Sequence, residues 1–113
     1  LGSAKSGVEH WWAERVSAVA LVPLTLWLLA SLIAHSADDY AALLDWLRAP
    51  ITTILMILLL IGLFHHAALG LQVVIEDYVH SGAKLVAIVA VRLLCFGFAV
   101  AGIIAVLEIA FTG

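Results

Sequence analysis

Three long runs with almost no charge limit this 113-residue chain to very few folds. Residues 16–34 and 51–75 contain no Asp, Glu, Lys or Arg, and residues 85–107 contain only Arg92. About 20 apolar residues cross the roughly 30 Å hydrocarbon core of a bilayer as a helix. Because backbone groups in lipid must be paired within their own segment, such runs are helical by default. We therefore predict an all-α membrane protein with three transmembrane helices.

The composition excludes several other classes of protein. Hydrophobic residues make up 65% of the chain and charged residues 12%, whereas a soluble domain is about 25% charged. An ordinary soluble domain, a disordered chain and a nucleic-acid binder are thereby excluded. Cys95 is the only cysteine, so this chain alone forms no intramolecular disulfide, iron–sulfur cluster or zinc ribbon.

We predict a single membrane domain over residues 1–113. Its spans are expected at about 14–35, 51–76 and 84–110. The segment between the first two spans is charged and aromatic, and residues 39–47 within it are expected to form a short interfacial turn or helix. Pro50 suits the first turn of the second span, and Pro23 is expected to kink the first. The first run is longer than the roughly 7–15-residue core of a signal peptide, which favours a retained span.

The basic residues predict the orientation of the spans. Four of them lie on or near the side that the N-terminus shares with the loop at 76–84, namely Lys5, Arg15, Lys84 and Arg92. Only Arg48 falls on the other side. The excess of Lys and Arg in cytoplasmic loops therefore predicts an N-terminus in the cytoplasm and a C-terminus outside.

Two adjacent histidines, His65 and His66, lie in the second span. Nine residues separate His66 from the end of the run, which places it about 13–14 Å deep. Ionisable groups at such depth are costly and usually functional. Each histidine either hydrogen-bonds a neighbouring helix or ligates a haem iron. Gly70, four residues after His66, leaves room on the same face for a flat macrocycle, or for close helix packing.

A haem with two axial ligands would need a second chain, because no histidine lies in the middle of the other two spans. At the predicted cytoplasmic end of the second span, Asp77 and Tyr78 are either solvated belt residues or groups that bind a quinone carbonyl and supply protons. His10, Arg15 and Ser17 begin the first span. Arg15 either anchors that end or neutralises a haem propionate.

Two stretches of the chain together resemble the small hydrophobic membrane anchor of succinate dehydrogenase (succinate:quinone oxidoreductase, respiratory complex II). They are GVEHWWAERVSAVALVPL at the first span and HHAALGLQVVIEDYVH at the end of the second. The second stretch is the more specific, with a glycine four residues after the histidine and Asp-Tyr eleven and twelve after it. The resemblance covers almost the whole chain and is greatest to alphaproteobacterial members, which implies a bacterial inner membrane with the C-terminus on its periplasmic side.

The resemblance implies that a b-type haem is shared with a second three-span anchor, the cytochrome b partner. His66 would be the axial ligand of the haem iron, with Gly70 in the haem surroundings. Arg15 would lie near a haem propionate and the quinone, and His10 close to the propionate. His65 receives no role from the resemblance.

The resemblance further implies that Tyr78 hydrogen-bonds a ubiquinone carbonyl beside Asp77. Succinate would be oxidised at FAD in the flavoprotein partner, and electrons would pass through the clusters of the iron–sulfur partner to ubiquinone. The chain alone would have no activity.

Other functions compete with this interpretation. One alternative is a structural anchor that binds no haem. Another is an anchor of the fumarate reductase type, although haem-free versions of that anchor lack the mid-span histidine. A small transport protein would use His65, His66 and Glu108 as a proton relay, yet the three unequal spans show no internal repeat. The sequence leaves three roles open for Arg92: its side chain extends to the membrane surface, faces the haem propionates, or faces the 76–84 loop.

Overall fold

The computed structural model describes residues 2–112, and within them the side chains of 8, 9 and 11–112. These residues form four helices and no strand. The helices are α1 (Gly2–Ala34), α2 (Tyr40–Arg48), α3 (Pro50–Tyr78) and α4 (Ala83–Phe111). Three segments are long and apolar enough to cross a membrane, Trp11–Ala34, Pro50–Tyr78 and Ala83–Phe111. The prediction of an all-α protein with three transmembrane helices is confirmed.

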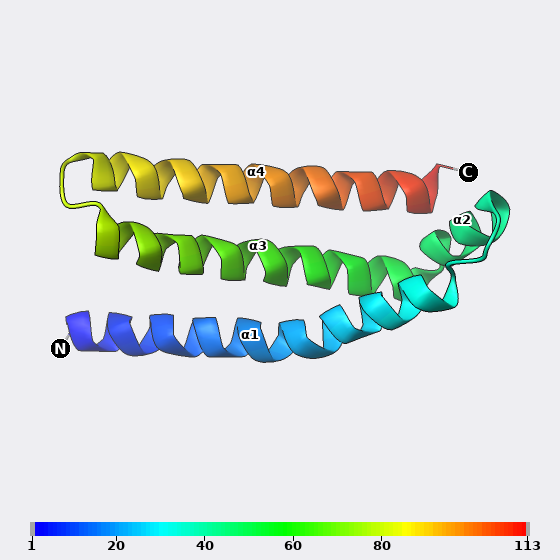
Figure 1. The fold of residues 1–113 in the computed structure, drawn as a ribbon, viewed down its shortest axis with the longest axis horizontal. Coiled ribbons are helices and arrows are strands. Elements are labelled where there is room, and N and C mark those ends of the chain that lie inside the picture. Colours follow the sequence, from blue (N-terminus) through cyan, green and yellow to red (C-terminus); the bar gives the residue numbers. More distant parts are fainter. Residues whose placement is uncertain (1, 113) are drawn as a thin grey trace.

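The three long helices lie side by side with α3 in the middle (Figure 1). Helix α3 packs against α1 and α4, whereas α1 and α4 do not meet within the described residues. The bundle measures 52 × 25 × 22 Å. The start of α1 and the α3–α4 loop lie at one end, while α2 and the end of α4 lie at the other (Figure 1). Neighbouring long helices are therefore antiparallel, as short connections require.

Helix α1 is longer than the span predicted at 14–35, because it begins at Gly2. Hydropathy marks where the bilayer is crossed, and a helix continues beyond it wherever its backbone remains hydrogen-bonded. Pro23 lies inside α1, and the helix bends in its second half (Figure 1). A proline removes one backbone hydrogen bond and clashes with the preceding turn, which is the ordinary cause of such a bend.

Glycines allow the long helices to approach closely at two points. A Cβ at Gly62 would lie 3.3 Å from the Leu21 side chain of α1, and one at Gly102 would lie 3.1 Å from the Leu60 side chain. Small residues are the usual means of close packing between helices in membranes, where no hydrophobic force brings them together. Leu59 is the one buried apolar residue among those described, so most of the apolar surface faces lipid or other chains.

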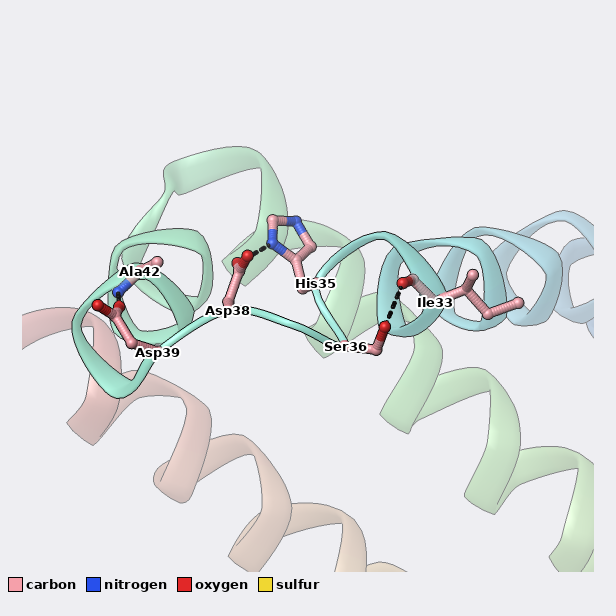
Figure 2. Close-up of polar contacts among 6 residues, drawn as sticks. All are labelled: Ile33, His35, Ser36, Asp38, Asp39 and Ala42. Carbon is pink, nitrogen blue, oxygen red and sulfur yellow. Dashed lines mark hydrogen bonds and ion pairs between the residues drawn. The ribbon is translucent and has the colours of Figure 1, made fainter.

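Helix α2 closes one end of the bundle through hydrogen bonds made within the chain. Figure 2 shows the His35 ring and the Asp38 carboxylate in contact, with Nδ1 and Oδ2 2.6 Å apart. The Asp39 carboxylate accepts a hydrogen bond from the Ala42 backbone N–H at 2.9 Å and so caps the N-terminus of α2 (Figure 2). The Trp46 indole stacks on the His35 ring, with ring centroids 4.7 Å apart. Of the turn or helix expected within 39–47, the structure has a helix, Tyr40–Arg48.

Arg48, in the last turn of α2, ties this helix to the end of α4. Its guanidinium donates from Nε to the Ile109 carbonyl at 3.0 Å and from Nη2 to the Thr112 carbonyl at 3.1 Å. The last carbonyls of a helix have no partner within the helix and carry partial negative charge. Arg48 therefore both satisfies those carbonyls and balances their charge.

Candidate functional site

His66 lies near the centre of α3, on the membrane-spanning part of that helix. Twelve residues separate it from Tyr78, or about 18 Å, and sixteen residues separate it from Pro50, or about 24 Å. Its side chain is half-buried. A helix this apolar holds the imidazole at a depth where only a specific partner compensates for the loss of water.

The partner of His66 within the chain is Ser17 of α1. The Ser17 Oγ lies 3.3 Å from the Nδ1 of His66 and also donates a hydrogen bond to the Glu14 carbonyl at 2.9 Å. Ser17 is only 7% exposed. It lies four residues before Leu21, which packs on Gly62 of α3, and this spacing places both on the same face of α1. The sequence placed Ser17 at the start of the first span but gave it no role.

Gly70 lies one turn from His66 and has open space where a side chain would be. A Cβ built on Gly70 meets nothing within 4 Å, in contrast with Gly62 and Gly102, where a Cβ meets a leucine. Gly70 is therefore not used to pack helices together within this chain. A bulky flat group bound at His66 would find room beside Gly70, so the residues present fit a haem.

The chemistry of the available donors also fits a haem better than a bare metal ion. Within the described residues, no three His, Cys, Asp or Glu side chains lie close enough to hold a metal ion together. A porphyrin supplies four nitrogen ligands of its own, so a protein needs to add only one or two axial ligands. A single histidine in the middle of a helix is enough for that task.

The other predicted site residues are not gathered around His66. The Arg15 guanidinium lies 5.1 Å from the centroid of the Trp11 ring, a cation–π contact, and Arg15 is exposed. Asp77 and Tyr78 are exposed in the last turn of α3, and Tyr78 is 80% exposed. The backbone of His10 belongs to α1, but its side chain lies outside the described residues.

His65 points to a different surface from that of His66. It lines a groove of about 640 Å³ that is bounded by α1, α3 and α4 and also includes Gln72 and Arg92. The Arg92 guanidinium donates to Gln72 Oε1, at 3.0 Å from Nε, and the Gln72 amide donates to Glu76 Oε1 at 3.0 Å. The described partner of Arg92 is therefore an amide on α3, which was not among the contacts that the sequence left open for it. Arg92 and Gln72 are polar residues at matched depth in two neighbouring spans, and this match is the sequence signal from which their contact could have been predicted.

The geometry separates Glu108 from the two histidines. Leu60 packs on Gly102 where α3 and α4 run antiparallel, so Glu108 lies level with position 54 of α3. Eleven residues, or about 16 Å along the helix, then separate this level from His65. A direct proton relay between Glu108 and His65 or His66 finds no support in this arrangement.

Comparison with known proteins identifies the family. The family described as succinate dehydrogenase/fumarate reductase transmembrane subunit matches residues 1–101. A succinate dehydrogenase hydrophobic membrane anchor subunit of Rickettsia bellii is 41% identical over 106 residues, covering 93% of this chain and 85% of the relative. Proteins of the same description from Rickettsia conorii and Paracoccus denitrificans are 32% identical over 106 residues and 35% identical over 92. These alignments cover 92% and 79% of this chain, and 84% and 69% of the respective relatives. The chain therefore belongs to the succinate dehydrogenase/fumarate reductase transmembrane subunit family, as a multi-pass hydrophobic membrane anchor of the succinate dehydrogenase kind.

Proposed function

We propose that this anchor supplies His66 as one axial ligand to a haem b shared with a second anchor, the cytochrome b partner, and that its Asp77–Tyr78 end forms part of a ubiquinone-reduction site. The observation that carries the proposal is a mid-membrane imidazole with open space at Gly70, one turn away. The remaining partners are the flavoprotein with its FAD and the iron–sulfur protein, in keeping with the succinate dehydrogenase relatives.

The exposed end of α3 suits contact with a quinone that diffuses in the bilayer. Tyr78 presents a phenolic O–H, which can donate a hydrogen bond to a quinone carbonyl oxygen. The Asp77 carboxylate beside it can accept a proton from water and pass it on at the membrane surface. Reduction of ubiquinone to ubiquinol consumes two electrons and two protons. The electrons come from succinate oxidised in the flavoprotein and pass through the clusters of the iron–sulfur protein.

The orientation completes the proposal. The start of α1 and the α3–α4 loop share one end of the bundle (Figure 1), and the excess of basic residues supports placing that end on the cytoplasmic side of the bacterial inner membrane. The flavoprotein and the iron–sulfur protein would dock there, next to Tyr78, and protons for the quinone would enter from the cytoplasm. Arg15, at the same end of α1, would provide positive charge near the haem propionates and the quinone. A bound haem would supply a one-electron acceptor within the membrane.

The experiment is a visible spectrum of the purified complex, with all its partner chains, carrying His66→Ala, and with His65→Ala as the matched control. The two positions are adjacent in the same helix, but His65 lines the groove, whereas His66 contacts Ser17. We expect the reduced b-type Soret and α bands to be lost in His66→Ala and kept in His65→Ala. Unchanged haem content in an assembled His66→Ala complex would refute the assignment and favour an anchor whose haem is held elsewhere.

A further inference from the structure

We infer that the Ser17 hydroxyl is a positioning group for His66: it accepts a hydrogen bond from Nδ1–H of the imidazole and thereby presents Nε2 as the ligating nitrogen. This inference rests on the proposed function, because it concerns how His66 would meet the haem iron. It assigns a role to a residue on a different helix from the ligand, and it makes the α1–α3 contact part of the cofactor site.

The direction of the hydrogen bond follows from the two contacts of Ser17. A serine hydroxyl has a single proton and two acceptor lone pairs. That proton is directed to the Glu14 carbonyl, 2.9 Å from Oγ. The oxygen therefore faces His66 Nδ1, 3.3 Å away, with a lone pair. The contact is satisfied when Nδ1 carries the imidazole proton, which leaves Nε2 unprotonated in the neutral ring.

Burial of Ser17 stabilises its hydrogen bond with His66. Ser17 is 7% exposed, and Leu21 packs on Gly62 one turn further along the same face of α1. Water has little access to compete for Oγ, and a hydrogen bond is electrostatically stronger where water is excluded. The imidazole is thus held in one orientation and one tautomer before any iron is bound.

The chemical consequence is a stronger ligand. Histidines that ligate metals usually donate their second N–H to an acceptor, and that bond raises the basicity of the ligating nitrogen. A more basic imidazole stabilises ferric iron more than ferrous iron. Loss of the Ser17 oxygen should therefore raise the midpoint potential of the haem, since the ferric form loses more stabilisation.

The test compares Ser17→Thr with Ser17→Val in the purified complex. Threonine and valine have nearly the same shape, but only threonine keeps the hydroxyl. We expect the haem midpoint potential to stay at the wild-type value in Ser17→Thr and to shift upward in Ser17→Val. Ser31→Ala removes another hydroxyl from α1 that makes no described contact with His66, and it should leave the potential unchanged. Equal potentials in Ser17→Thr and Ser17→Val, with haem retained, would overturn the inference.

A second measurement covers the case in which Ser17→Val does not assemble. Pulsed EPR of the wild-type ferric complex, with ¹⁵N-histidine placed only in this chain, reports on the remote imidazole nitrogen and its exchangeable proton. A hydrogen-bonded Nδ1–H supports the inference, and a coupling typical of a free N–H overturns it. Failure of the proposed function is recognised separately, because it leaves haem in place in His66→Ala.

Discussion

The two ends of the helix bundle differ in how their polar groups are satisfied. At the end closed by α2, the chain pairs them itself, as Asp39 caps α2 and Arg48 binds the last carbonyls of α4. At the opposite end, the side chains of Asp77 and Tyr78 have no hydrogen-bond partner among the described residues, and Tyr78 is 80% exposed. The helix ends at the first end are thus satisfied within one chain, whereas the Asp77 and Tyr78 side chains at the second end are left exposed.

The same contrast holds along α3. Near the α2 end, Thr52 and Thr53 are buried, and the Thr53 hydroxyl donates to the Ala49 carbonyl at 3.3 Å. Beyond His66, the helix presents Gly70 with empty space around it. Contacts within the chain are thus concentrated near the α2 end, and the function is proposed at the opposite end. Matched substitutions at the two ends test this division.

The largest effect is expected from Tyr78→Phe, with Tyr40→Phe at the α2 end as its control. The two tyrosines are similarly exposed, at 80% and 76%. Removing a hydrogen bond to a quinone oxygen that gains charge costs about 1.5–3 kcal/mol, which is roughly a ten- to hundredfold loss of turnover. Quinone-reductase activity should fall by this factor in Tyr78→Phe, while electron transfer from succinate to an artificial acceptor is kept. Tyr40→Phe should keep both activities.

Two results would break this part of the comparison. Equal loss of both activities in Tyr78→Phe would mean failed assembly rather than a damaged quinone site. A comparable loss of quinone reduction in Tyr40→Phe would place quinone chemistry at the α2 end, and the proposed difference between the ends would then be wrong.

A smaller effect, on stability alone, is expected from Arg48→Ala. The substitution removes two charge-assisted hydrogen bonds to the end of α4, and such bonds contribute about 1.5–3 kcal/mol each where they are shielded from water, and less at exposed positions. The thermal unfolding midpoint of the purified complex should fall, with both activities at 25 °C unchanged. Asp45→Asn alters a charge on the exposed side of the same helix and should leave the midpoint in place. A drop of equal size in Asp45→Asn would mean that the net charge of α2, and not the contact with α4, is what matters.

The sequence predicted the three spans and the helix between the first two because those signals are local. The length of an apolar run is read directly from the sequence. Asp39 before α2 and Pro50 at the start of α3 mark where helices begin. His65 and His66 were singled out by their depth in the span, which is also a local property, and His66 was chosen between them by the family resemblance. Its role remains a prediction that the spectrum of His66→Ala will test.

Which faces of the helices meet was beyond the sequence. Each span is apolar around most of its circumference, so no hydrophobic stripe indicates which side packs against a neighbour. The contact of Ser17 with His66 and that of Arg92 with Gln72 both depend on the rotation of one helix against another. Antiparallel pairing determines only the depth in the membrane at which residues of two helices lie level. It does not determine which way a side chain faces, so the sequence left several contacts open for Arg92.

The smallest effect is expected at the one boundary signal that acts through a single hydrogen bond, the Asp39 cap of α2. Asp39→Ala removes the acceptor for the Ala42 N–H, and loss of an N-cap costs about 1 kcal/mol. Hydrogen exchange of the first amides of α2 should become about fivefold faster in the assembled complex. Asp39→Asn keeps an acceptor oxygen in the same place and should preserve most of the protection. If both variants exchange at the wild-type rate, α2 is held by Arg48 and the Trp46 stack on His35, and the order at this end comes from tertiary contacts and not from the cap.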